Sequence, residues 1–459
     1  MNTTEEKTIK AKLTEGDISQ LLIKLSIPMM LGLISISLMN IIDTYFVGHL
    51  GTKDLAAISF TFPVVSLMGS LYFGLGNGVA SVIARAIGNG DKYHVQRLTT
   101  DSIILAVIIM TIFMVIGLCT IDPLFKTLGA TSDLLPLIRS YMSIWYLGMV
   151  FLVIPLIGNN ALRAAGNTVF PSIIMFLACI INSALDPIFI FGLFGFPRLE
   201  LQGAALATVL ARISTFIVSI YLLHNKEDML TFKIPKHHEI FKSWKDILHI
   251  GLPSVLTNII NPISIAIITA MVAYFGVNAI ASFGVVSRVE MFIVMILASL
   301  SSVIGPFVGQ NWSSKKFDRV YEALHKSFVF CIFWGCISTI VLFFFGGWIS
   351  GIFNKDPDVV RISSMYFSIL PLSYGGLGLI MVSNSTLNAI GMPFKSSLVT
   401  ITRTILLYLP LAYLGKEYLG LSGIFLAAAL ANILTGLMFY YWNKNTCLHC
   451  SLENKNCEN

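Results

Sequence analysis

Charged residues are scarce in this chain. Only 12% of its 459 residues are Asp, Glu, Lys or Arg, while 56% are hydrophobic, and the mean hydropathy is +0.80. Soluble domains carry roughly 25% charged residues, about twice this share. The composition therefore excludes an ordinary soluble globular protein and predicts a polytopic membrane protein.

Two further patterns are missing. Residues 1–20 are polar and mixed in charge, without the short apolar core of a cleavable secretory signal. We expect them to form a cytoplasmic segment and the first membrane helix to direct insertion. Short alternating apolar strands are also missing, because the apolar runs are long and continuous, which indicates helices rather than a β-barrel.

The seven cysteines give no disulfide framework. Four fall in predicted membrane spans and three in a polar tail at 444–459, which we expect in the cytoplasm, where thiols stay reduced. In this tail Cys447, His449 and Cys450 are candidate metal ligands, but one short cluster without a second pair is a weak signal. The alternative is a disordered polar tail.

Basic residues mark alternate loops. They cluster within 7–24, 85–97, 226–245 and 315–326, and the loops between these clusters carry few. Because cytoplasmic loops are enriched in Lys and Arg, we expect a multi-pass protein of the inner (plasma) membrane with both termini in the cytoplasm. Charges spread over short loops exclude a nucleic-acid-binding face.

Hydropathy predicts about twelve membrane helices. A hydrophilic linker at 224–246 separates a first lobe at 21–223 from a second lobe at 247–443, with six helices in each. The expected helices lie at about 28–51, 55–80, 99–121, 134–160, 169–191, 201–223, 247–275, 279–309, 320–348, 362–385, 394–414 and 421–442.

The two halves carry an internal repeat. Matching landmarks recur about 225 residues apart, as expected of transporters built from repeats. They are Pro28 and Pro253, Gly51 and Gly276, Ala56 and Ala281, and Gly166 and Gly391. Two acids break this symmetry, because Asp43 matches Ile268 and Asp186 matches an apolar residue near Leu411. We therefore expect the functional site in the first lobe.

Asp43 and Asp186 fall within membrane helices, where an ionised Asp near the centre costs about 2.5 to 3.5 kcal/mol. Asn182 precedes Asp186 by four residues, so its amide can reach the carboxylate from the same helix face. Pro187 removes a backbone donor and is expected to weaken the helix there. Because burial disfavours the charged form of a carboxylate, the pattern predicts a proton or small-cation site. A structural role for both acids is the alternative.

Glu290 and Arg288 lie near membrane depth in the eighth predicted helix. Residues two apart point to different faces, so we do not expect them to pair. Glu290 is either part of a second polar site, with Arg288 and with Asn261 of the seventh helix, or a structural contact to another helix. Three other arginines are expected near cytoplasmic helix ends, where snorkelling explains them. They are Arg163, Arg212 and Arg403.

Four stretches together carry a family resemblance. They read NIIDT at 40–44, LRAAGNT at 162–168, NSALDP at 182–187 and GAALAT at 203–208. The chain resembles, over essentially its whole length, the MATE family of multidrug and toxic compound extrusion transporters, and more closely its DinF-like branch. The resemblance implies an all-α MATE/MOP-type fold of two six-helix bundles, arranged as a V that opens to each side in turn.

The resemblance also implies that a polar network in the first lobe binds the coupling cation and that the first helix bends on protonation. The matching positions of this network are Asp43, Tyr141, Asn159, Asn182, Asp186 and Thr208. Two departures weaken the match around Asp43, because Met39 stands where this branch often has Tyr and Leu156 where a further Asn occurs. The acid that NorM-like members carry in the seventh helix is missing near Asn261, which argues against a sodium site there.

The resemblance implies a transporter and not an enzyme. We expect a monomer without a cofactor that exports small, often cationic, drug-like compounds in exchange for H⁺ or Na⁺. A flippase for lipids or polyprenyl-linked sugars is one alternative, for which a more cationic cavity is expected. An intramembrane aspartyl protease is another, although Asp186 lacks the Gly-x-Gly context of such proteases.

Overall fold

The computed structural model describes residues 10–233 and 235–457, and within these ranges its regular elements are all helices. Those of the first half are α1 (Ile18–Gly48), α2 (Thr52–Gly88), α3 (Lys92–Thr127), α4 (Leu135–Leu147), α5 (Met149–Ala164), α6 (Val169–Phe191) and α7 (Glu200–Tyr221). Those of the second half are α8 (His237–Ala273), α9 (Val277–Ser313), α10 (Phe317–Phe353), α11 (Pro357–Ile369), α12 (Tyr374–Ala389), α13 (Pro393–Ile401), α14 (Leu409–Leu419) and α15 (Leu421–Cys457). Short 3₁₀ turns and π-helical segments connect or extend them at η1 (Lys12–Thr14), η2 (Leu193–Gly195), η3 (Leu222–Lys226), η4 (Leu370–Ser373) and η5 (Thr402–Tyr408).

The twelve predicted membrane spans are confirmed. Eleven helices or joined helices in the described ranges are long and apolar enough to cross a membrane, and the bent pair of α4 and α5 makes twelve when it is counted as one span. This twelfth span is bent by 46° at the junction between Leu147 and Met149. The fold is therefore all-α and polytopic, as expected.

Several helices extend beyond their apolar cores. Helix α1 begins at Ile18 rather than near Pro28, and α8 begins at His237 rather than near Ile247. Hydropathy detects only the apolar part of a helix, whereas these first turns are partly polar. Pro187 does not interrupt α6, which continues to Phe191. The weakening of the helix at Pro187 stays a prediction.

The repeat is visible in the elements themselves. Helices α2 and α9 begin 225 residues apart (277 minus 52) and end 225 residues apart (313 minus 88). The residues before them, Gly51 and Gly276, have φ angles of 141° and 97°. Gly166 and Gly391 match in the same way, with φ angles of 79° and 82°. Glycine recurs at these positions because other residues rarely adopt such angles.

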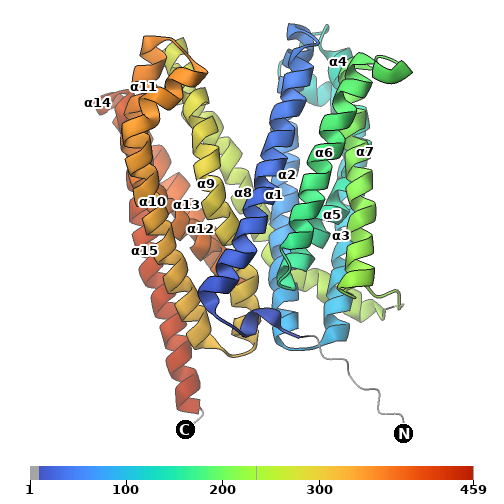
Figure 1. The fold of residues 1–459 in the computed structure, drawn as a ribbon, viewed down its shortest axis with the longest axis vertical. Coiled ribbons are helices and arrows are strands. Elements are labelled where there is room, and N and C mark those ends of the chain that lie inside the picture. Colours follow the sequence, from blue (N-terminus) through green and yellow to red (C-terminus); the bar gives the residue numbers. More distant parts are fainter. Residues whose placement is uncertain (1–9, 234, 458–459) are drawn as a thin grey trace. The chain divides into compact units, whose positions relative to one another are not determined.

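By packing, the chain divides into two units. One contains Ile27–Gly251, and the other contains Ala11–Ser26 together with the chain from Leu252 onward. Each unit is a bundle of long helices (Figure 1). The predicted division placed 21–26 in the first lobe and treated 224–246 as a linker. In the structure residues 21–26 pack with the second unit, and residues 224–246 pack with the first unit.

The N-terminal segment 11–26 is held by α9 and α10. The backbone N–H of Leu13 donates to Oε1 of Gln310 at 3.1 Å, and Nδ2 of Asn311 donates to the carbonyl of Leu13 at 3.0 Å. Nη1 of Arg319 donates to the carbonyl of Gly16 at 2.9 Å. Leu13, Gln310 and Asn311 are all buried. Residues that precede the first lobe in sequence thus complete the second.

The linker and the start of α8 are held by α2 and α3 in a corresponding way. Nε2 of Gln96 donates to the carbonyl of Asp228 at 2.8 Å, and Nε1 of Trp244 donates to the carbonyl of Asp101 at 3.1 Å. Gly78 of α2 lies directly against the first part of α8, because a Cβ placed there would lie 2.6 Å from the carbonyl oxygen of Ile247. Residues 228–251 therefore belong to the packing of the first lobe.

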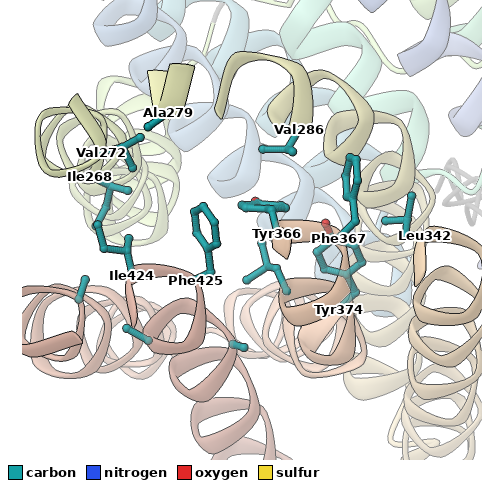
Figure 2. Close-up of a cluster of buried hydrophobic side chains, with 14 residues drawn as sticks. Ile268, Val272, Ala279, Val286, Leu342, Tyr366, Phe367, Tyr374, Ile424 and Phe425 are labelled. Atoms are coloured by element: carbon teal, nitrogen blue, oxygen red, sulfur yellow. The ribbon is translucent and has the colours of Figure 1, made fainter. Parts of the chain in front are cut away.

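The core of the second lobe is rich in aromatic side chains. Figure 2 shows Tyr366, Phe367, Tyr374 and Phe425 among buried aliphatic residues of the surrounding helices. The rings of Tyr366 and Phe425 meet edge to face, with centroids 4.8 Å apart. Tyr366 and Tyr374 bring hydroxyl groups into an otherwise apolar core.

The backbone of α15 remains helical to Cys457, which corrects the alternative of a disordered tail. The side chains of Cys447, His449 and Cys450, which were candidate metal ligands, lie outside the described residues.

Candidate functional site

Asp186 of α6 is the most deeply buried acid of the predicted network, with 0% of its surface exposed. Nδ2 of Asn182 donates to its Oδ1 at 3.2 Å and also approaches Oγ1 of Thr208 on α7 at 3.4 Å. The spacing of four residues on α6 produces the first contact, as predicted from the sequence. Asn182, Asp186 and Thr208 are thus brought together in the first lobe.

Asp43 of α1 and Tyr141 of α4 face the same region. The charge of Asp43 is close enough to that of Asp186 for the two to interact, and Tyr141 lies within electrostatic range of both. Tyr141 is buried, with 6% of its surface exposed. Three helices, α1, α4 and α6, therefore direct ionisable groups to one site, while α7 contributes Thr208.

Arg212 and Tyr72 also belong to this site, which the sequence reasoning missed. Arg212 lies near the middle of α7 rather than near a cytoplasmic end, and its guanidinium carbon is 5.3 Å from the ring centroid of Trp145. It interacts electrostatically with Asp43, Tyr72 and Tyr141. Snorkelling therefore does not explain Arg212. Its position in the middle of a predicted span was the signal that could have identified it.

Several oxygen atoms of the site have no hydrogen-bond donor. Within the described part of the chain, Oδ1 of Asp43, Oδ2 of Asp186 and Oδ1 of Asn182 are buried without a partner, and so are Nη1 of Arg212 and the hydroxyl of Tyr72. Roughly 90% or more of buried polar groups normally have a partner, so a group of orphaned acceptors calls for an explanation. A proton or a small cation would satisfy these oxygens.

Asn159, the sixth predicted member, lies in α5 and is buried, with 8% of its surface exposed. Its Oδ1 is likewise without a partner among the described residues. Its neighbour Asn160 instead serves local structure, because its amide donates to the carbonyl of Leu156 at 2.8 Å. Among the described residues, Asn159 forms no hydrogen bond with the other five residues.

Glu290 of α9 forms a separate cluster in the second lobe. The hydroxyl of Tyr366 donates to Oε2 of Glu290 at 2.7 Å, and Arg403 lies within electrostatic range of this carboxylate. Arg288 and Asn261, the other two members of the predicted second-lobe site, have exposed side chains. Among the described residues neither forms a hydrogen bond or an ion pair with Glu290, so the structure does not assemble these three residues into one polar network.

Arg403 is also placed differently from the prediction. It lies in the π-helical segment η5, within the span Pro393–Leu419, and its Nε donates to Oδ1 of Asn432 at 2.7 Å. This hydrogen bond inside the lobe shows that snorkelling does not explain Arg403. Arg163, at the end of α5, hydrogen-bonds Asn160 and remains close to a helix end.

Acidic, His and Cys side chains do not form a metal site in the part of the chain that the structure describes. Nowhere in it do three or more of them converge in a group that could hold a metal ion. The donors available in the first-lobe site are carboxylate, amide and hydroxyl oxygens, which suit hard cations.

Comparison with known sequences decides the family. The model of the MatE family matches residues 28–188 and 253–414, one stretch in each half. The chain belongs to the MatE family. MatE proteins are transporters and not enzymes, so the protease alternative is excluded.

Two curated relatives differ in what their names say they carry. A protein of Shewanella oneidensis named "FAD transporter" is 38% identical over 435 residues, covering 95% of this chain and 96% of the relative. The "Probable multidrug resistance protein YoeA" of Bacillus subtilis is 24% identical and covers 96% of both chains.

A solved structure supports the same membership. The Vibrio cholerae MATE transporter VcmN, in the bent form, aligns with a TM-score of 0.90 and 25% identity, covering 95% of this chain and 98% of the other. The twelve-span MATE/MOP-type fold is therefore confirmed, and this MatE chain is a multi-pass membrane protein.

Proposed function

We propose that this chain is a cation-coupled antiporter that exports small organic molecules across the inner (plasma) membrane. The observation that carries the proposal is the first-lobe site, in which Asp43 and Asp186 interact electrostatically and each keeps an orphaned oxygen within a membrane bundle. Charged groups inside membranes are costly and usually mark ion pathways. Membership of a transporter family supplies the context.

The proposed cycle couples the two solutes through one site. A proton or Na⁺ entering from outside neutralises the first-lobe acids and favours one conformation, whereas the substrate favours the other. Each charge moved inward is driven by about 2.3 kcal/mol per 100 mV of membrane potential. The chain then acts as a monomer that opens to each side in turn, with both termini in the cytoplasm and no bound cofactor.

Two substrate classes have support. Multidrug relatives favour small, often cationic, drug-like compounds. A specific observation favours flavin nucleotides as the second candidate, because the relative named "FAD transporter" shares 38% identity over nearly the whole chain. A lipid or polyprenyl-linked sugar flippase, the remaining alternative from the sequence, has no similar support among the relatives described above.

The test is transport by purified protein in proteoliposomes. Efflux of ethidium, an organic cation, and of FAD is measured under a proton gradient and under a sodium gradient applied separately. We expect one gradient to drive efflux, and Asp43→Asn and Asp186→Asn each to abolish it. Asp133→Asn, which changes an exposed acid in the loop between α3 and α4, serves as the matched control and keeps native rates.

Two outcomes would contradict the proposal. If transport persists in both first-lobe variants, the acids are structural and the coupling site lies elsewhere. If neither gradient drives efflux by the native chain, the protein is not a cation-coupled antiporter.

A further inference from the structure

Arg403 occupies an unusual backbone segment of the second lobe. The span Pro393–Leu419 is built from α13, the seven-residue π-helical segment η5 and α14, and Arg403 is the second residue of η5. π-helical segments are rare and occur frequently at functional sites. This segment places a permanently charged guanidinium inside a membrane span, where charge is costly.

Among the described residues, the protein hydrogen-bonds the guanidinium of Arg403 through one nitrogen, Nε. Nε of Arg403 donates to Oδ1 of Asn432 at 2.7 Å, and Nδ2 of Asn432 donates to Oγ of Ser373 at 2.9 Å. Oγ of Ser373 in turn donates to the carbonyl of Leu370 at 2.8 Å. Asn432 and Ser373 are buried. This chain of hydrogen bonds fixes the orientation of Arg403.

The two terminal nitrogens of Arg403 are not used by the protein. Within the described residues, Nη1 and Nη2 have neither a hydrogen bond nor an ion pair. The carboxylate of Glu290 accepts from the hydroxyl of Tyr366 at 2.7 Å and interacts with Arg403 electrostatically, without a hydrogen bond to it. A guanidinium with two free, parallel N–H edges is a bidentate receptor for phosphate or carboxylate.

The surroundings of Arg403 suit an aromatic molecule. Tyr408 of the same π-helical segment packs against the second-lobe core and interacts with Arg403. Tyr366 and Tyr374 are buried in that core (Figure 2), so of these three tyrosines only the half-buried Tyr408 is accessible beside Arg403. Its ring provides stacking area, and its hydroxyl provides a polar contact at the edge.

We propose that Arg403 binds the phosphate of a phosphate-bearing aromatic substrate within the second lobe. This inference rests on the proposed function and specifies its substrate class. It makes Arg403 a substrate-binding residue and Asn432 the residue that positions it. Glu290 is then a neighbour of the bound anion rather than the obligatory counter-ion of Arg403.

The experiment compares substrates that differ in phosphate. Proteoliposomes are assayed with FAD, with riboflavin, which has the same ring system without phosphate, and with ethidium. We expect Arg403→Gln to lower FAD transport by about tenfold to a hundredfold, as loss of hydrogen bonds to a charged group implies. Transport of riboflavin or ethidium stays at the native rate. Arg403→Lys, which keeps the charge without the fork, gives an intermediate loss.

Two controls separate this role from a structural one. Arg361→Gln changes an exposed arginine paired with Asp358 and leaves every rate unchanged. Glu290→Gln keeps or raises FAD transport if Arg403 binds the anion, because it removes a repelling charge. If Arg403 serves only to pair with Glu290, both variants lower transport of all three compounds equally, and the proposal is overturned.

Failure of the phosphate site can be distinguished from failure of the proposed antiport. If the native chain exports ethidium but not FAD, the antiport stands and the phosphate site is overturned. If the native chain exports none of the three compounds under either gradient, the proposed function itself fails. A native-like melting temperature of each variant in detergent confirms that a lost activity reflects binding rather than unfolding.

Discussion

Buried hydroxyl groups in the second lobe differ in what they contribute. Tyr366 and Tyr374 are large, buried and part of the same core, but only Tyr366 donates to a carboxylate. The hydroxyl of Tyr374 has no partner among the described residues. A hydrogen bond to a charged group typically stabilises a fold by about 1.5 to 3 kcal/mol, whereas an unpartnered hydroxyl contributes nothing of this kind.

Substituting each tyrosine by phenylalanine tests this difference. We expect Tyr366→Phe to lower the melting temperature of the detergent-purified protein clearly, because Glu290 loses its donor. Tyr374→Phe removes the same atom from the same core and is expected to leave the melting temperature unchanged or slightly higher. Equal shifts in the two variants would show that the hydrogen bond to Glu290 adds no stability.

Single residues also show which parts of the site the sequence could predict. The contact between Asn182 and Asp186 followed from helix geometry, because it lies within one helix. Asp43 was predicted from its charge within a membrane-length apolar helix, and the family resemblance identified Tyr141 and Thr208, which lie on two further helices. Arg212 was missed because its contacts cross from α7 to α1, α2 and α4, and no local pattern encodes such distances.

At the scale of elements, close helix packing depends on where a glycine lies. Gly78 and Gly69 are both in α2, but their surroundings differ. A Cβ at Gly78 would lie 2.6 Å from the carbonyl oxygen of Ile247 and 2.9 Å from the amide of Gly251, whereas a Cβ at Gly69 would meet nothing within 4 Å. Only Gly78 is therefore required by the contact between α2 and α8.

We expect Gly78→Ala to destabilise the protein by about 1 to 3 kcal/mol, because the methyl group would push two backbones apart. Gly69→Ala is expected to be neutral or stabilising by up to about 1 kcal/mol, because alanine favours a helix more than glycine does. Melting temperatures in detergent measure both. A stable Gly78→Ala variant would mean that the start of α8 is free to shift.

The elements themselves were largely predictable. The twelve apolar runs predicted the membrane spans, and the glycine landmarks predicted the repeat that α2 and α9 display. Hydropathy did not give the polar first turns of α1 and α8, because their stability comes from packing and not from apolar length. It also gave no sign of η5, since a π-helical segment depends on contacts of the whole span.

At the scale of the whole molecule, each lobe packs with the segment that precedes the other lobe in sequence. Residues 11–26 pack with the second unit, and residues 228–251 with the first. Buried hydrogen bonds of Asn311 hold the former, and Gln96 holds the latter. Each segment should therefore be released independently.

Limited trypsin digestion in detergent tests the independence of the two segments. We expect Asn311→Ala to speed cleavage after Lys12 by about tenfold, as loss of ~1.4 kcal/mol of local stability implies, without changing cleavage after Lys226. Gln96→Ala should have the reverse effect. Simultaneous release of both segments in either variant would show that they open as one unit.

The packing of residues 11–26 and 228–251 also bears on how a chain with two repeated halves arises. Its two crossover points, after Ser26 and after Gly251, are 225 residues apart (251 minus 26), which is the spacing of the repeat. An ancestor with a single lobe would have had to pair with a second copy, each copy lending its first turns to its twin. Gene duplication and fusion would convert this swapped homodimer into one polypeptide, in which two equivalent halves were free to diverge.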